Sequence, residues 1–339
     1  MGRFLETEKQ RQIAFKARSA TLSDTARADG VYRGKARPFC LPVEHAEENL
    51  YPGIRTNALA YAARHGIGWH HGRDGKPSNH LCSSQVCCVN FLFPLADQPH
   101  ALAELLRPLY PELRRMLPIE DGLYGALEWI GEKNYLGERV PRSGRRTRGA
   151  NCTSADAAVM FERADRKRQI VLIEWKYTES YGRTCLRYSK SGTDRLCIYL
   201  SLLERDDCPI DRSLLPDWDA LFHEPFYQLM RQQLLAHEME RARELGADSV
   251  SVLHIAPEHN ADFRRVTSPQ LAGLGDSPTA IWNRLVRQEG RFFSVGTEAL
   301  FGALHAEQTP ELEPWLAYIT ERYGWLVASA DAAHHRESV

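Results

Sequence analysis

The sequence predicts a mixed α/β protein built around a β-hairpin. Residues 151–177 read NCTSADAAVMFERADRKRQIVLIEWKY, in which two apolar segments flank a charged turn. Residues 123–130 (LYGALEWI) and 248–256 (DSVSVLHIA) have the composition typical of further strands. Residues 222–245 carry apolar side chains at helical spacing, and Gly246 follows them as a typical helix end. Strands and at least one long helix are therefore expected in a single fold.

Composition and charge limit the classes of protein that this chain can represent. A length of 339 residues allows one core with additions as readily as two domains. The chain is 43% hydrophobic and 26% charged, and its net charge of -1 removes any global electrostatic argument for nucleic-acid binding. No apolar stretch approaches the roughly 18 residues that span a bilayer, and the first residues lack the apolar core of a signal peptide. A cytoplasmic protein without a membrane partner is expected, with its eight cysteines as reduced, buried side chains.

The N-terminal quarter of the chain divides into two segments. Residues 1–37 are polar, and we expect an arm with at most short helices. Residues 38–81 are expected to form two short helices, broken at Pro52 and Gly53, and then a loop. This loop region holds four candidate zinc ligands, but their spacing fits no established zinc pattern and a hydrogen-bonded loop is preferred: His70, His71, His80 and Cys82.

Helices are expected on both sides of the hairpin in the sequence. Residues 83–95 read as a buried helix that starts at a serine cap. Residues 99–117 continue with apolar side chains at helical spacing, as a second helix or a bent continuation. Residues 196–203 are apolar enough for either a strand or a helix. Residues 261–339 are expected to form a helical C-terminal extension.

Two acidic residues and a lysine interrupt the apolar segments of the hairpin. If the turn centres on Asp165, Asp156 lies opposite Glu174, because the two are equidistant from it. Directly opposite side chains of an antiparallel pair point the same way, with Cβ atoms about 4.5–5.5 Å apart. Two carboxylates that close repel each other, and a divalent cation removes the repulsion. Hard oxygen ligands favour Mg²⁺ or Mn²⁺, so this pair is a candidate metal site.

Basic residues surround the candidate site. Strand alternation places Lys176 on the face of Glu174, where its ammonium could orient a metal-bound water or offset charge on phosphorus. Two loops rich in basic residues flank the hairpin, and the second also contains Tyr181 and Tyr188, whose rings could stack on unpaired bases. The predicted phosphate contacts are Arg142, Arg145, Arg146 and Arg148 in the first loop and Arg183, Arg187 and Lys190 in the second.

These residues carry a resemblance to a known superfamily. Asp156 followed by Glu174, Trp175 and Lys176 resembles the PD-(D/E)xK nucleases, which have a restriction-endonuclease-like fold. The resemblance covers residues 82–257 and implies an αβββαβ core, a central mixed sheet flanked by helices, within residues 82–260. It also implies that Asp156 and Glu174 bind metal and that Lys176 serves the catalytic water. The chain departs from the motif at Ala155, where the superfamily name has proline.

The resemblance adds two candidates for the site. Members often recruit a further acidic residue, and Glu128, among apolar neighbours in the strand at 123–130, is the candidate here. Gln228, near the start of the following helix, resembles a glutamine that some nuclease branches keep near the site.

The predicted function is a Mg²⁺-dependent endonuclease that acts on DNA, in a bacterial restriction or defence role. One alternative is a nucleic-acid-binding protein of the same fold without activity, although the retained charges argue against it. Another is a nuclease that cleaves RNA. A homodimer is expected because cutting both strands of a duplex commonly requires two active sites.

Overall fold

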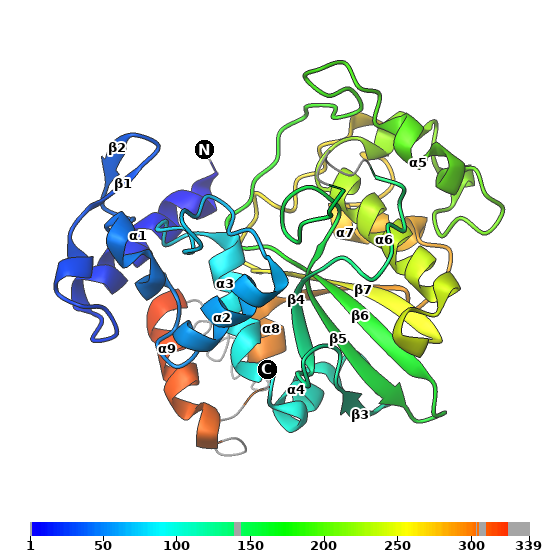
Figure 1. Ribbon diagram of the computed structural model, residues 1–339. Coiled ribbons are helices and arrows are strands. Elements are labelled where there is room, and N and C mark those ends of the chain that lie inside the picture. The colour runs from blue at the N-terminus through cyan, green and yellow to red at the C-terminus, as the bar shows by residue number, and fades with distance from the viewer. Residues whose placement is uncertain (1, 139–143, 303, 305–309, 325–339) are drawn as a thin grey trace, which may run out of the picture.

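A six-stranded mixed sheet forms the centre of the computed structural model, which describes residues 2–138, 144–302, 304 and 310–324 (Figure 1). β5 pairs antiparallel with β6 and, along its other edge, with both β3 and β4. β6, β7 and β8 then run parallel to one another. The strands are β3 (Leu113–Leu117), β4 (Gly125–Trp129), β5 (Ala155–Arg163), β6 (Arg168–Trp175), β7 (Ser249–Ala256) and β8 (Phe292–Gly296).

The predicted hairpin is confirmed as β5 and β6, and both faces of it are buried. Val159 and Ile173 point into one apolar core cluster, whereas Met160 and Leu172 point into another. A strand buried on both faces reads as a nearly continuous apolar run rather than as an alternating pattern. This explains why the sequence shows the strands clearly and why a charge within them stands out.

Helices cover the two faces of the sheet separately. Figure 1 shows α1, α2, α3 and α9 gathered on one side and α5, α6 and α7 on the other. This arrangement is a central mixed sheet flanked by helices, as predicted, and it is compatible with a restriction-endonuclease-like core. The helices are α1 (Arg3–Arg18), α2 (Arg55–His65), α3 (Ser84–Leu92), α4 (Pro99–Leu106), α5 (Leu196–Leu203), α6 (Phe226–Ala242), α7 (Pro278–Leu285), α8 (Thr297–Phe301) and α9 (Glu313–Tyr323).

The N-terminal segment differs from the expected solvated arm. It contains the 16-residue helix α1, with the side chains of Glu8, Gln12 and Phe15 buried, followed by a small hairpin of β1 (Gly30–Tyr32) and β2 (Lys35–Arg37). Gln12 bonds the buried Arg322 of α9. The prediction of short helices at most was therefore wrong. A polar helix can be buried when a distant segment supplies partners for its polar groups.

Three other elements correct or complete the sequence predictions. The expected helix over 99–117 stops at Leu106, and the rest contributes strand β3. The segment 196–203 is a helix, which decides between the two alternatives. β8 was not predicted, so the expected helical extension also contributes a strand to the sheet. The long helix begins at Phe226 rather than Phe222, directly after Pro225.

Two predictions from composition can be compared with the fold. All eight cysteines are free, although Cys185 and Cys197 are exposed rather than buried. Among the described residues, no helix has both the length and the apolar character needed to cross a bilayer.

Candidate functional site

Asp156 lies where the ladder between β5 and β6 ends. The strands pair from Glu162 with Arg168 up to Ala157 with Ile173. This register confirms the predicted one and, continued by one step, sets Asp156 opposite Glu174. The regular pairing stops there, and the backbone N–H of Trp175 instead donates to Oδ2 of Asp156 at 2.7 Å. The carboxylate thus stands at the point where the two strands separate.

Glu128, on the neighbouring strand β4, forms a third carboxylate in line with Asp156 and Glu174. Its flanking residues pair as Leu127 with Ala157 and Trp129 with Ala155, so Glu128 lies beside Asp156. Its backbone has a left-handed φ of 48°, which is uncommon for a residue other than glycine and is typical of strained functional sites. Three carboxylates therefore come from three adjacent strands.

Hydrogen bonds hold the outer two carboxylates in place. Glu128 accepts from Nε2 of Gln85 at 2.8 Å and from Oγ of Ser154 at 2.9 Å. Glu174 accepts from Nε2 of Gln232 at 2.8 Å and forms an ion pair with Nζ of Lys176 at 2.5 Å. Asp156 has a single bond from the described residues, to the Trp175 N–H, which leaves Oδ1 without a protein partner.

The surroundings shift the pKa values of these groups. Burial, and next the negative charge of Glu174, raises the pKa of Asp156 well above its usual range. Burial also raises the pKa of Glu128. For Lys176, burial favours the neutral amine, but the surrounding acidic groups, Glu174 first among them, together outweigh burial and hold the pKa well above the usual value. The site therefore contains more buried acidic groups than Lys176 alone can compensate.

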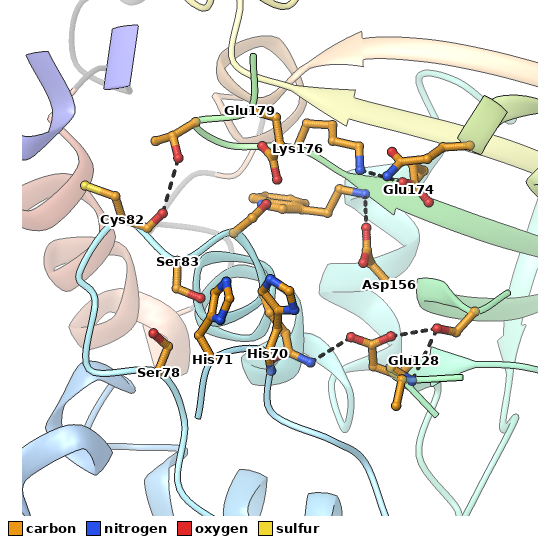
Figure 2. A pocket seen from close by; sticks show the side chains of 18 of the residues that line it. His70, His71, Ser78, Cys82, Ser83, Glu128, Asp156, Glu174, Lys176 and Glu179 are labelled. Carbon is orange, nitrogen blue, oxygen red and sulfur yellow. Dashed lines mark hydrogen bonds and ion pairs between the residues drawn. The ribbon is translucent and has the colours of Figure 1, made fainter. Parts of the chain in front are cut away.

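The three carboxylates and Lys176 line one cavity of about 590 Å³. Figure 2 shows Glu128, Asp156 and Glu174 along one wall, with His70 and His71 on the segment next to it. Much of the remaining wall comes from the segment between α2 and α3, from the loop before β5, from the residues after β6 and from α6. Among the further residues that line it are Gln85, Thr153, Ser154, Glu179, Gln228, Arg231 and Gln232.

The glutamines around the cavity were only partly predicted. Gln228 does line it, but Gln228 accepts a hydrogen bond from Tyr181 at 3.3 Å and, within the described residues, makes none to Glu174. Gln232, one helical turn later, makes the contact with Glu174. Sequence reasoning also missed Gln85 as the partner of Glu128. The available signal for Gln232 was its spacing of four residues from Gln228, which places both on one helix face.

The predicted phosphate contacts fall into two groups. Arg146 and Arg148 are engaged within the protein: Arg146 donates to the carbonyls of Ile130 and Gly131 at 3.0 and 2.9 Å, and Arg148 forms an ion pair with Glu120. Arg187 is likewise paired, with Asp194 at 3.0 Å and Asp219 at 2.6 Å. By contrast, the described part of the chain shows Arg145, Arg183 and Lys190 exposed and without an ion pair; Arg142 lies outside the described residues.

The histidine-rich loop borders the same cavity. His70, His71, His80 and Cys82 all line it. Nδ1 of His80 accepts from the Cys82 N–H at 3.1 Å, and burial lowers the pKa of His80 to about 4. Within the described residues, no group of three His, Cys, Asp or Glu side chains is arranged to hold a metal ion.

The fold and the site together define the class: a mixed α/β protein with a restriction-endonuclease-like arrangement and a buried acidic cavity at the end of its central hairpin. A protein-family model described as restriction endonuclease associating with ARP matches residues 9–324. The chain belongs to this family, and membership supports a nuclease-type function in general. Comparisons with curated proteins and with solved structures gave no match.

Proposed function

We propose that the protein is a metal-dependent nuclease of the PD-(D/E)xK type, with DNA as the expected substrate. The observation that carries the proposal is the row of Glu128, Asp156 and Glu174 beside Lys176 in one cavity. A purely structural cluster would be neutralised by its own neighbours, whereas here Asp156 keeps a raised pKa and an oxygen without a protein partner. Family membership supports the nuclease class independently.

The donor set fits a hard divalent cation. Asp156 and Glu174 would hold Mg²⁺ or Mn²⁺, because carboxylate oxygens are the ligands these ions prefer. Two protein carboxylates suffice, since Mg²⁺ usually keeps several waters and completes its shell with substrate phosphate. The lack of a three-residue cluster in the described chain is therefore compatible with this ion. When bound, the metal would supply an activated water and charge neutralisation on the phosphate.

The protein residues have separate roles in this proposal. Gln232 and Lys176 fix the two oxygens of Glu174, and Gln85 and Ser154 fix Glu128. The Lys176 ammonium would orient the attacking water and offset negative charge that develops on phosphorus. Glu128 would serve as the further acidic residue. The hydrogen bonds from Gln85 and Ser154 orient the Glu128 carboxylate, and neither donor atom bonds Asp156 or Glu174.

A cleavage assay with a matched lysine variant tests the proposal. Duplex DNA, single-stranded DNA and RNA are incubated separately with Mg²⁺, with Mn²⁺ and with EDTA. The expected result is cleavage that EDTA abolishes and that Lys176→Ala loses while keeping the wild-type circular dichroism spectrum. Lys167→Ala, in the exposed turn at the far end of the same hairpin, is the control and should cleave normally.

The other outcomes identify the alternatives. Cleavage of RNA alone would make the protein an RNase. Binding of nucleic acid without cleavage, at saturating Mn²⁺ and over all three substrates, would mean an inactive protein of the same fold. Wild-type rates in Lys176→Ala would remove the proposed site.

A further inference from the structure

We propose that Arg231 forms a phosphate-binding subsite in the wall of the acidic cavity. The inference rests on the proposed nuclease function and gives a role to a residue that was not among the candidates predicted from the sequence. Arg231 lies on α6 three residues after Gln228 and directly before Gln232, and all three side chains line the cavity. The helix face that fixes Glu174 through Gln232 therefore also presents a guanidinium to the same space.

Arg231 lacks the partners that other arginines of this protein have. Its Nε is buried and meets no hydrogen-bond partner, and none of the described carboxylates forms an ion pair with the guanidinium. Arg148 and Arg187, by comparison, are each paired with carboxylates. A guanidinium cannot lose its charge in a protein, and a partly buried charge without a partner is costly. The cost is compensated if a ligand supplies the missing acceptor.

Of the carboxylates around Arg231, Glu138 and Glu174 are committed elsewhere, whereas Glu224 keeps a buried oxygen without a partner but forms no ion pair with the guanidinium within the described residues. Glu138 accepts from the Thr153 N–H at 2.6 Å and from the Tyr199 hydroxyl at 2.9 Å. Glu174 is shared between Lys176 and Gln232. The ring of Tyr227 lies 4.8 Å from the Arg231 guanidinium, so a cation–π contact holds the side chain in position without using its N–H donors. The donors thus remain available in a fixed orientation.

The chemistry of the subsite follows from the charges of the cavity. Among the described residues that line it, the lysine and arginine side chains are those of Lys176 and Arg231, and Lys176 is paired with Glu174. Arg231 is then the cation that can accept a new anion. The planar guanidinium matches two oxygens of a phosphate in a bidentate geometry, which an ammonium cannot reproduce. A phosphodiester group of the substrate, in DNA or RNA, is the ligand that this arrangement selects.

Binding measured against salt tests the subsite separately from catalysis. A fluorescein-labelled 20-nucleotide duplex DNA, its single strand and the matching RNA are titrated in EDTA at several KCl concentrations. Arg231→Met is expected to weaken binding and to reduce the slope of log affinity against log salt by about one, because one phosphate contact is lost. Arg241→Met is the matched control: Arg241 lies on the same helix, is about half exposed and pairs with Asp207. Its slope should stay at the wild-type value.

Steady-state cleavage in Mg²⁺ completes the test. Arg231→Met is expected to lower kcat/KM by about 10- to 100-fold, and Arg231→Lys, which keeps the charge but not the fork, by at least about fivefold. Arg231→Lys decides the question if Arg231→Met fails to fold. Wild-type kcat/KM and salt slope in both variants would overturn the subsite and leave the nuclease intact. A wild-type protein that neither binds nor cleaves any of the three substrates would overturn both proposals.

Discussion

Two buried polar clusters in this protein differ in whether they are complete. The first surrounds Arg322 of α9, whose side chain has five N–H donors. The guanidinium donates to five acceptors: the Gln12 side chain, the Asn49 carbonyl, the Asn49 side chain, the Tyr318 hydroxyl and the Leu81 carbonyl. Each donor has a partner, and the ring of Tyr323 lies 5.1 Å from the guanidinium. This cluster joins the two ends of the chain to the segment before α3.

The second cluster, at the end of the hairpin, is incomplete. Within the part of the chain that the structure describes, Asp156 accepts one hydrogen bond, from the Trp175 N–H, and its pKa is raised by burial and by Glu174. Arg231 has no acceptor among the described residues. A complete buried cluster stabilises the fold, whereas an incomplete one beside a cavity is arranged for something that binds there. Whether the polar groups of a buried cluster all have partners therefore distinguishes a structural cluster from a functional one, whatever residue types it contains.

The largest expected effect is on the incomplete cluster. Asp156→Asn should lower the cleavage rate by at least about 10³-fold, since a metal ligand is lost. The same variant should be more stable than wild type at pH 7, by about 1 kcal/mol or more. Urea unfolding and steady-state cleavage measure the two effects. Asp165→Asn, in the exposed turn of the same hairpin, is the control and should change neither.

The pH dependence of this stabilisation has a definite sign. A raised pKa means that the folded protein holds the Asp156 proton more tightly than the unfolded chain does. Asp156 therefore destabilises the folded state progressively as the pH rises from its ordinary value of 3.8 towards the raised value. Asp156→Asn should match wild type below this window and exceed it above. A constant difference in unfolding free energy across the window would contradict the assignment.

The next largest effect should fall on stability alone. Arg322→Met removes a donor from each of these five acceptors, of which the Asn49 carbonyl still accepts from Asn90. It should cost about 3–5 kcal/mol of unfolding free energy, while the folded fraction keeps its cleavage rate. Urea unfolding measures the loss. Arg18→Met is the matched control, because Arg18 is exposed at the same α1–α9 contact and, among the described residues, bonds only the Glu321 carbonyl, at 3.4 Å. A smaller loss for Arg322→Met than for Arg18→Met would show that the complete cluster is not structural.

The smallest effect distinguishes two neighbouring glutamines. Gln232→Leu removes the bond to Glu174 and should lower kcat/KM by about 10- to 100-fold, as expected when a residue that orients a metal ligand is lost. Gln228→Leu removes a bond to Tyr181 and should have an effect below about fivefold. Cleavage kinetics at several Mg²⁺ concentrations compare the two. A larger loss of kcat/KM in Gln228→Leu than in Gln232→Leu would show that Gln228 is the glutamine of the site, as the sequence had indicated.

The sequence alone determined the centre of the fold because the relevant signals are local. A charged turn between two apolar runs fixes a hairpin, and the position of Asp165 at its centre fixes the register that brings Asp156 opposite Glu174. The strand that holds Glu128 was equally visible. Each of these elements is buried on both faces, so its composition reflects its environment.

Only the tertiary structure decided which distant groups complete these elements. Nothing near Glu8 or Gln12 in the sequence predicts that α1 is buried, because the partner of Gln12 is Arg322, 310 residues away. Spacing places three polar side chains on one face of α6, yet Gln232 bonds Glu174, Gln228 bonds Tyr181 and Arg231 has no acceptor among the described residues. Helical spacing assigns a residue to a face. The partner it meets there depends on long-range packing.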